Sequence, residues 1–249
     1  MTRRTDAAKR LRRMHDRLAR AYGPQHWWPA ETAFEVILGA YLTQNTAWKA
    51  VERSLANLRD AGALTLEGLR AIAVEDLSRL IQPSGFFTRK APALKAFAAM
   101  VDEEFSGSLE VLAATATPAL RKRLLALPGV GPETADAILL YALGHPVPVA
   151  DEYLRRVAER HELLDAGSGR SQYDSLADLT RRAFAADPAA DHARLFNEFH
   201  ALTVAVGKAH CGRVPCCEGC PLAFDLRAVE GKAAGSRQPA PSRRKLETS

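Results

Sequence analysis

The chain has 249 residues, of which 47% are hydrophobic and 25% are charged, and its formal net charge is +5. This composition excludes a collagen-like or wholly disordered chain, and no apolar run reaches the roughly 18 residues that a membrane span needs. A mildly basic chain favours a polyanionic partner, and the charged N-terminus lacks the apolar segment of a secretory signal. We therefore expect a soluble, cytoplasmic protein without a membrane partner.

Apolar residues recur every three to four positions through most of the chain, which is typical of amphipathic helices. Pairs of alternating segments, which are typical of β-hairpins, are not apparent. The predicted helices span residues 7–22, 33–42, 47–58, 65–73, 75–81, 90–105, 109–114, 135–143, 152–162, 172–184 and 191–209. The predicted fold class is all-α. The Gly, Ala, Ser, Pro and basic residues near the C-terminus predict a disordered tail at 228–249.

The segment 127–135, Leu-Pro-Gly-Val-Gly-Pro-Glu-Thr-Ala, interrupts this helical pattern with two glycines. It predicts a helix, a tight hairpin and a second helix. Gly129, Val130, Gly131 and Thr134 would then lie at a helix N-terminus, where backbone N–H groups bind a phosphate of nucleic acid. An ordinary helix–helix turn is the alternative.

The four cysteines lie close together, at Cys211, Cys216, Cys217 and Cys220. Such clustering in an intracellular chain favours a metal site over a disulfide framework. Thiolates at this density suit a [4Fe–4S] cluster or structural zinc. Because only one C-x-x-C pair is present and a proline follows it, we favour the [4Fe–4S] cluster, with zinc or no metal as alternatives.

Taken together, these motifs resemble those of the helix-hairpin-helix DNA glycosylases of the endonuclease III superfamily, and most of all the 3-methyladenine DNA glycosylase III branch. The segments that carry the resemblance are 27–29, 42–46, 83–87 with 90–91, 127–135, 149–151 and the cysteine loop. The resemblance implies two helical domains with a DNA-binding groove between them. A helical barrel with the hairpin would span 28–143, and residues 1–27 plus 144–227 would form the cluster domain. It also implies a monomer that binds damaged double-stranded DNA.

Asp151 matches the catalytic aspartate of this family. Loss of a base leaves a sugar with oxocarbenium character, and a nearby carboxylate stabilises that charge. The alternative is that Asp151 only caps the helix that follows it.

Glu133 stands where bifunctional members carry a lysine, whose amine attacks the sugar. The resemblance thus implies a monofunctional glycosylase that uses water and leaves an abasic site. Alternatively, Glu133 only begins a helix, where the helix dipole favours a negative side chain.

The resemblance further implies a pocket for a flipped base, lined by Trp27, Trp28, Trp48, Glu133 and Lys208. Aromatic faces attract a cationic alkylated purine such as 3-methyladenine. The alternatives are that Trp27 and Trp28 belong to the core and that Lys208 is a solvated surface charge.

Gln44 matches the residue that fills the gap left by a flipped base, and Phe86 matches the opposing wedge. Lys90 and the basic run 121–123 are candidate phosphate contacts. Each of these side chains has a structural alternative as a helix-end, core or surface residue.

The cysteine loop departs from the family spacing C-x6-C-x2-C-x5-C, because the fourth position falls on Leu226. Cys216 or Asp225 would have to supply the missing ligand. Two other functions stay open, namely a glycosylase for oxidised pyrimidines or mismatched U/T, and a non-catalytic DNA-binding protein. Asp151 discriminates against the second, since a mere binder has no need of a carboxylate facing a sugar.

Overall fold

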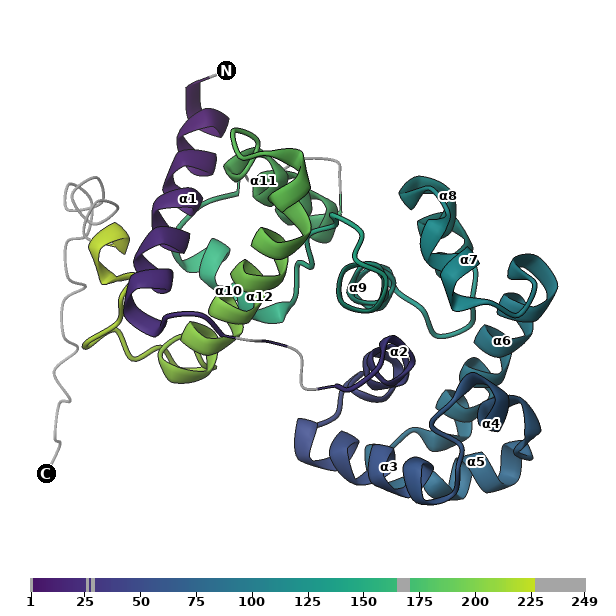
Figure 1. Ribbon diagram of the computed structural model, residues 1–249. Coiled ribbons are helices and arrows are strands. Elements are labelled where there is room, and N and C mark those ends of the chain that lie inside the picture. Colours follow the sequence, from purple (N-terminus) through teal and green to yellow (C-terminus); the bar gives the residue numbers. More distant parts are fainter. Residues whose placement is uncertain (1, 26, 28–29, 165–170, 227–249) are drawn as a thin grey trace, which may run out of the picture.

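A computed structural model describes residues 2–25, 27, 30–164 and 171–226. Within these ranges every regular element is a helix (Figure 1), so the predicted all-α class is confirmed. None of the helices in these ranges is both long and apolar enough to cross a membrane. The tail predicted at 228–249 lies outside the described residues.

The helices follow one another in the order given by their bounds: α1 (Thr2–Tyr22), α2 (Ala33–Leu42), α3 (Trp48–Asp60), α4 (Leu66–Ala71), α5 (Val74–Leu80), η1 (Gln82–Ser84), α6 (Phe87–Phe105), α7 (Leu109–Ala114), α8 (Thr117–Leu125), α9 (Pro132–Ala137), η2 (Ile138–Ala142), α10 (Glu152–Arg160), α11 (Gln172–Ala183), η3 (Ala189–Asp191) and α12 (His192–Ala209). Two predicted helices match to the residue, 33–42 and 109–114. The others differ at their ends, and the short helices η1 and η3 were not predicted.

Side-chain caps explain where several helices begin. The hydroxyls of Thr32, Thr65, Ser108 and Ser171 accept hydrogen bonds from the backbone three residues later, at 3.0–3.2 Å. Each bond satisfies an N–H group that the first helical turn cannot pair internally.

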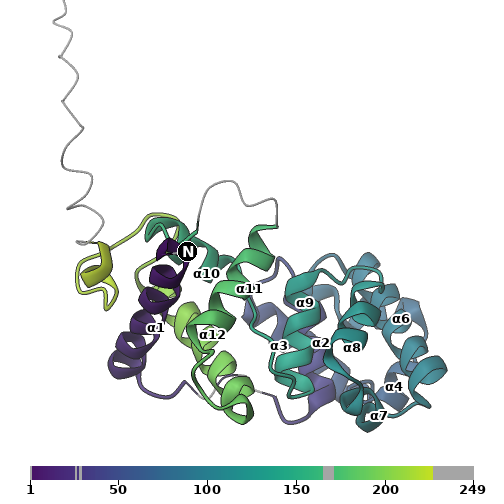
Figure 2. The ribbon, with the colours of Figure 1, turned by 90° about the horizontal axis from the view of Figure 1, so that it is seen from above.

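Helix α2 is the central element of the larger group of helices. All its residues after the first are buried, and it packs against α3, α6, α9 and η2. Figures 1 and 2 show α2 and α9 in the middle of the molecule, and Figure 1 shows α4 to α8 together on one side of them. A helix that is apolar on every face needs such surroundings.

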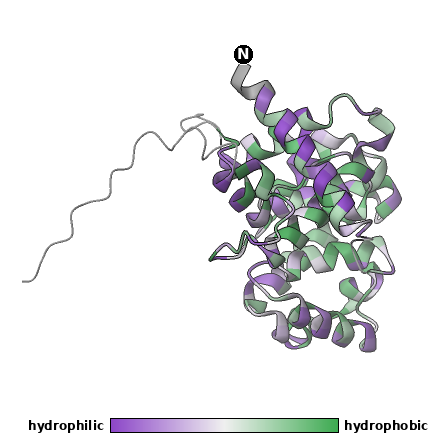
Figure 3. Cartoon of the chain, turned by 90° about the vertical axis from the view of Figure 1, so that its left-hand side faces the viewer, coloured by the Kyte–Doolittle hydropathy of each residue, from purple (hydrophilic) through white to green (hydrophobic). Residues whose placement is uncertain are grey.

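Helices α1, α10, α11 and α12 form the second group, in which α1 packs on α11 and α12, and α10 packs on α12. The chain therefore begins and ends its described part in the same group. At the crossing of α10 and α12, a Cβ atom added to Gly207 would lie 2.2 Å from the Tyr153 ring. The two helices approach closely because position 207 has no side chain. Figure 3 shows hydrophobic stretches in the interior and hydrophilic stretches along the outer helices.

The predicted helix–hairpin–helix is formed by α8, the glycine turn and α9. Gly129 has a φ of 74°, a left-handed conformation that glycine adopts without strain. The predicted second helix at 135–143 is only partly right, because α9 changes into the π-helix η2 at Ile138. Buried Asp136 of α9 accepts hydrogen bonds from Arg121 of α8 at 2.6 and 3.0 Å and from the Tyr173 hydroxyl of α11 at 2.8 Å. This network joins the hairpin to the second group of helices.

Candidate active site

Asp151 lies at the N-terminus of α10 and is only 7% exposed. Its Oδ1 atom accepts a hydrogen bond of 2.9 Å from the backbone N–H of Leu154. The capping role considered from the sequence is therefore present. It uses one carboxylate oxygen and leaves Oδ2 for other contacts.

The Oδ2 atom of Asp151 lies 3.3 Å from Nε2 of His200, a buried residue of α12. The distance is that of an ion pair, but the angles are not those of a hydrogen bond, and Nε2 makes no hydrogen bond with the described residues. The other ring nitrogen, Nδ1, makes a short hydrogen bond with the hydroxyl of Tyr141 in η2. Three elements therefore meet at one carboxylate.

Glu133 lies in the first turn of α9, and its side chain is exposed. The surrounding protein nevertheless desolvates its carboxyl group. This desolvation, followed by the negative charge of Asp151, raises the pKa of Glu133, while the imidazole of His200 acts in the opposite direction. The two carboxyl groups and the imidazole thus share one electrostatic environment.

We call Asp151, Glu133 and His200 the carboxylate cluster. Trp27 lies between this cluster and the exposed Lys208. Its ring meets that of His200 nearly edge-on, with centroids 6.4 Å apart. The Nζ atom of Lys208 lies 5.5 Å from the Trp27 centroid, which is a cation–π distance. The structure therefore brings together Asp151, Glu133, Trp27 and Lys208, four of the residues expected to line the site.

Trp48 is half-buried at the start of α3 and packs against the hydrophobic core. Trp28 lies outside the described residues. Stacking of either ring on a base stays a prediction.

The Gln44 side chain is held by the hairpin. Its Nε2 atom donates hydrogen bonds of 2.9 Å to the carbonyl of Gly129 and to the Thr134 hydroxyl. The loop that follows α2 and the glycine turn therefore lie side by side. Thr134 directly follows Glu133, so this contact lies one residue from the carboxylate cluster.

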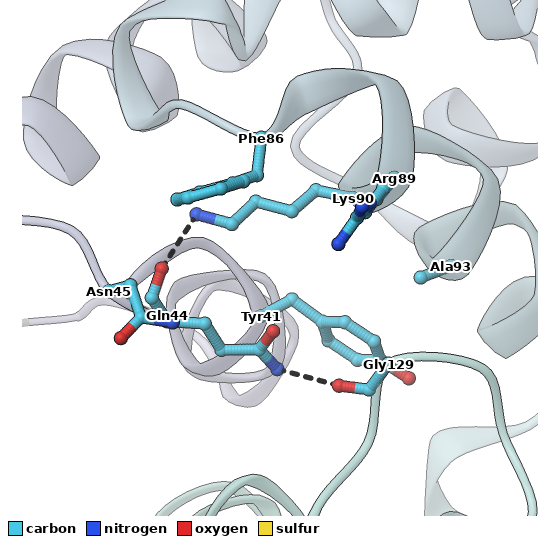
Figure 4. A pocket seen from close by; sticks show the side chains of 8 residues that line it. All are labelled: Tyr41, Gln44, Asn45, Phe86, Arg89, Lys90, Ala93 and Gly129. Atoms are coloured by element: carbon cyan, nitrogen blue, oxygen red, sulfur yellow. Dashed lines mark hydrogen bonds between the residues drawn. The ribbon is translucent and has the colours of Figure 1, made fainter.

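A pocket opens beside this contact, lined by Tyr41, Gln44, Asn45, Phe86, Arg89, Lys90, Ala93 and Gly129 (Figure 4). Phe86 forms one wall and is 58% exposed, which is unusual for a large apolar side chain. Its φ of 48° is left-handed, a conformation that costs a non-glycine residue free energy. An exposed and strained phenylalanine is more consistent with an insertion role than with the core.

The surroundings of Lys90 differ from those expected of a phosphate contact. It is 5% exposed, and its Nζ atom donates to the carbonyls of Leu42, Gln44 and Ser84 and to the Thr46 hydroxyl, at 2.7–3.1 Å. Burial lowers the pKa of Lys90 to about 8. Because its donors are used inside the protein, Lys90 is not available to a phosphate. It instead joins the loop of Gln44 to the turn before Phe86.

The basic run at 121–123 is also partly occupied. Arg121 is held by Asp136, and Arg123 pairs with Glu104 at 2.8 Å. The Arg123 side chain is still 59% exposed and Lys122 is exposed, so a phosphate contact from this run stays a prediction.

The four cysteines lie in the loop that follows α12. Cys211 is buried, Cys220 is half-buried, and Cys216 and Cys217 are exposed. Desolvation is the largest cause that raises the pKa of Cys220, and the negative charges of Cys211 and Cys217 add to it. Cysteine thiolates are the ligands that an iron–sulfur cluster uses. In the described residues, however, no three His, Cys, Asp or Glu side chains are grouped so that they could hold a metal ion.

Asp225, one alternative for the missing ligand, is committed elsewhere. Its carboxylate accepts hydrogen bonds from Arg10 at 2.5 and 3.0 Å and contacts Nδ1 of His161 at 2.9 Å. Burial opposes its charge, but His161 and Arg10 more than compensate and lower the pKa of Asp225 to about 2. A carboxylate so engaged would have to give up these partners to bind a metal, which disfavours that alternative.

Comparisons with known proteins identify the family of this chain. Residues 38–181 match the model of the HhH-GPD superfamily base excision DNA repair proteins. A putative DNA repair glycosylase of Methanocaldococcus jannaschii is 38% identical over 81% of this chain and 88% of its own length. The chain belongs to the HhH-GPD superfamily. The expected class of enzyme, a DNA glycosylase, is confirmed at the level of this family.

Two solved structures resemble this HhH-GPD protein over most of its length. The 3-methyladenine DNA glycosylase of H. pylori, bound to 1,N6-ethenoadenine, is 29% identical, with a TM-score of 0.67 over 82% of this chain and 97% of its own. An endonuclease III in a trapped covalent complex with DNA is 21% identical, with a TM-score of 0.70 over 91% and 98%. The likeness to endonuclease III confirms the fold.

Sequence analysis missed His200 and Tyr141 in this HhH-GPD site. Both interrupt apolar runs, of α12 and of the stretch after α9, with a polar group. Such an interruption is a weak signal, because a lone polar residue on an apolar face is more often a satisfied core residue. Their meeting with Asp151 depends on the packing of α12 and η2.

Proposed function

We propose that this protein is a monofunctional DNA glycosylase that removes alkylated purines such as 3-methyladenine from double-stranded DNA. The observation that carries the proposal is the carboxylate of Asp151, buried at a helix N-terminus beside Glu133 and near Trp27. A helix N-terminus favours an ionised carboxylate. A carboxylate held in place stabilises positive charge more effectively than one that must reorganise.

In the proposed reaction the damaged nucleotide leaves the duplex, and its sugar lies against Asp151. As the bond from C1′ to the base breaks, the sugar gains positive charge and the carboxylate stabilises it. The base leaves with the electron pair of this bond, so a cationic 3-methyladenine departs as a neutral base. Water attacks C1′ and passes a proton to the Asp151 carboxylate, which returns it to bulk water. The products are a free base and an abasic site.

Glu133 supports the monofunctional form of this reaction. A carboxylate at this position has no amine to form a Schiff base with the sugar. Its negative charge beside Asp151 also favours a cationic base. Lys208 is a lysine near this site, because its Nζ atom lies over the ring of Trp27. Borohydride trapping of the wild-type protein tests whether Lys208 substitutes as nucleophile.

Cationic purines are supported as substrates by the likeness to the glycosylase of H. pylori that binds 1,N6-ethenoadenine. An alkylated purine has a weakened glycosidic bond and needs extrusion and an aromatic slot more than general-acid help. Trp27 would supply one face of that slot, and we propose Trp48 and Trp28 as further walls. Glycosylases for oxidised pyrimidines or mismatched U/T are the alternative outcome of the test.

We also propose that DNA is held by both groups of helices. The backbone of Gly129, Val130 and Gly131 would bind a phosphate, while Gln44 and Phe86 would enter the duplex. In this proposal residues 28–143 form one domain and residues 1–27 plus 144–227 form the other. The protein would act as a monomer, since one chain supplies every group in the site.

A [4Fe–4S] cluster on Cys211, Cys216, Cys217 and Cys220 is part of the proposal. It would stabilise the loop after α12 and take no part in the reaction. Iron and sulfide analysis of anaerobically purified protein, with absorbance in the visible range, tests this. Zinc in place of iron, or Cys216→Ser protein with full iron content, would contradict the proposed set of ligands.

The experiment for the function is a single-turnover assay on duplexes containing 3-methyladenine, 7-methylguanine, 1,N6-ethenoadenine, thymine glycol, uracil or a G·T mismatch. Release of free alkylpurine without strand scission is the expected result. Asp151→Asn should lower that rate by about 10²- to 10³-fold, as loss of a preorganised charge does elsewhere. Asparagine still caps a helix, so the fold is kept.

The matched control is Asp60→Asn, at an exposed aspartate that ends α3 and lies outside the site. Its rate should equal that of the wild type. If Asp151→Asn retains full activity, or if the protein binds every duplex without releasing a base, the enzymatic proposal is wrong and the non-catalytic alternative holds.

A further inference from the structure

One oxygen of the Asp151 carboxylate faces a buried histidine. The backbone of Leu154 fixes Oδ1, whereas Oδ2 lies 3.3 Å from Nε2 of His200. Both residues are 7% exposed. Nε2 makes no hydrogen bond with the described residues. Its polar contact among them is the one with Oδ2 of Asp151.

Tyr141 determines which nitrogen of His200 carries a proton. Burial, and next to it the negative charge of Asp151, raise the pKa of Tyr141 well above its usual value, so the hydroxyl stays protonated. A neutral imidazole has one donor and one acceptor nitrogen. When the Tyr141 hydroxyl donates to Nδ1, the imidazole proton is on Nε2, the ring nitrogen that lies 3.3 Å from Oδ2 of Asp151.

The surroundings of His200 are acidic on several sides. Asp151 faces it from the N-terminus of α10 and Glu133 from α9, whereas Tyr141 of η2 and Trp27 are its neutral neighbours. On its own helix, Glu198 acts on Tyr141, and Lys208 lies beyond Trp27. An imidazolium at this place would therefore pair with a carboxylate.

We propose that His200, oriented by Tyr141, is a positioning residue for the catalytic carboxylate of Asp151. The neutral ring sets Nε2 against Oδ2, at 3.3 Å, and restricts the rotamers of the carboxylate. A protonated ring forms an ion pair with the same oxygen and weakens the stabilisation of the cationic sugar. This inference rests on the proposed function and adds to it a pH-sensitive support for the catalytic group.

Variants of His200 separate the positioning of the carboxylate by the neutral ring from the ion pair made by the protonated ring. Glutamine can donate a hydrogen bond to Oδ2 but cannot become charged, whereas leucine can do neither. Tyr141→Phe keeps the ring packing and removes the donor to Nδ1. His192→Gln is the control, because His192 is on the same helix and its Nε2 contacts the carbonyls of Phe184 and Asp187 at 3.1 Å, away from Asp151.

The measurement is the single-turnover rate of base release with saturating protein, from pH 5 to pH 9, after thermal melting has shown that each variant folds. The wild type and His192→Gln should lose rate at acidic pH. His200→Gln should keep its rate at alkaline pH and lose the acidic decline. His200→Leu and, to a smaller extent, Tyr141→Phe should be slower at every pH, His200→Leu by at least about tenfold, because the carboxylate is no longer held in place.

A second measurement does not depend on activity. The NMR signals of the two His200 ring nitrogens should differ between the wild type and Asp151→Asn, because the contact with the Oδ2 carboxylate oxygen is lost. Unchanged ring signals, an acidic decline that persists in His200→Gln, or a full rate in His200→Leu would overturn the inference. If the wild type releases no base from any duplex, the proposed function fails, and the ring signals still decide whether His200 and Asp151 are in contact.

Discussion

The side-chain amide of Gln44 lies 2.9 Å from the hydroxyl of Thr134 and joins the loop after α2 to the first turn of α9. The same amide group reaches the carbonyl of Gly129. In the absence of DNA the residue proposed to enter the duplex is therefore held against the hairpin that is proposed to bind its backbone. Binding of DNA would exchange these two hydrogen bonds for contacts with the duplex.

Replacement of Gln44 by alanine should affect catalysis more than stability. The loss of two partly exposed hydrogen bonds lowers the free energy of unfolding by about 1 kcal/mol. A side chain that fills the gap behind a flipped base offsets part of a cost of a few kcal/mol, so we expect excision to slow by about ten- to hundredfold. The slowing should be smaller for a lesion opposite a mismatch, which single-turnover assays measure directly.

The control for this variant is Gln172→Ala, at an exposed glutamine of α11 that is far from Gln44 in the sequence. Its amide donates a hydrogen bond of 2.8 Å to Glu159. Its excision rates should equal those of the wild type on both duplexes. Equal slowing of Gln44→Ala on paired and mismatched lesions would contradict a role in extrusion.

Phe86 should show opposite effects on stability and activity. Because it adopts a left-handed φ of 48°, glycine at this position relieves strain. We expect Phe86→Gly to raise the free energy of unfolding by about 1 kcal/mol and to reduce excision from duplex DNA. Phe86→Ala should reduce excision without the gain in stability. Chemical denaturation and single-turnover rates give the two values.

Ser106 offers a matched control, because it ends α6 with a similar φ of 54°. Ser106→Gly should be stabilised like Phe86→Gly while it keeps full activity. An active Phe86→Gly protein would show that the exposed ring is not a wedge.

These examples show what a sequence can and cannot predict here. Thr32 and Ser108 precede apolar runs as helix caps do, and the helices that begin there were predicted to the residue. The glycines of the hairpin likewise determine a local turn. Such features depend on neighbours within a few positions of the chain.

Lys90 and His200 depend on distant neighbours instead. Lys90 is typical of a surface cation in the sequence, and it is buried because oxygens from two separate loops converge on it. His200 meets Asp151 only because α12 crosses the start of α10. No local pattern encodes either contact, whereas the resemblance to known glycosylases located Asp151 through the motif around it.

Replacement of Lys90 by methionine should destabilise the protein by about 2–4 kcal/mol at pH 7, because buried oxygens lose a charged donor. The effect should depend on pH. The pKa of Lys90 falls from 10.5 in the unfolded chain to about 8 in the folded one, so between these values the unfolded state binds more protons. The wild type therefore gains stability with rising pH in this window, and the gap to Lys90→Met widens.

Urea denaturation at pH 7, 8, 9 and 10 measures this gap. Lys49→Met, at an exposed lysine of the neighbouring α3, should show neither the loss nor the pH dependence. A gap that narrows above pH 8 would contradict a lowered pKa for the buried ammonium.

Asp225 should prove structural, with no part in binding the metal. Asp225→Asn removes the partner of half-buried Arg10 and buried His161, so we expect a loss of about 3–5 kcal/mol at pH 7. Because the pKa of Asp225 is lowered to about 2 from 3.8, its stabilisation is complete above pH 3.8 and is lost as the pH falls toward 2. Iron content per folded molecule should stay at the wild-type value.

Asp102→Asn is the comparison for this variant, since Asp102 pairs with Arg70 on the surface. It should cost no more than about 1 kcal/mol. A loss of iron from Asp225→Asn that the folded fraction does not explain would restore Asp225 as a ligand.

Glu133→Lys tests the monofunctional assignment by supplying the missing amine. The pKa of Glu133 responds to the charge of Asp151, so a side chain at this position lies within electrostatic reach of the catalytic carboxylate. A lysine there should attack C1′ and form a Schiff base with the sugar. Sodium borohydride should then trap a covalent complex with Glu133→Lys and none with the wild type or Glu133→Gln. Trapping of the wild type, abolished by Lys208→Met, would instead assign the nucleophile to Lys208.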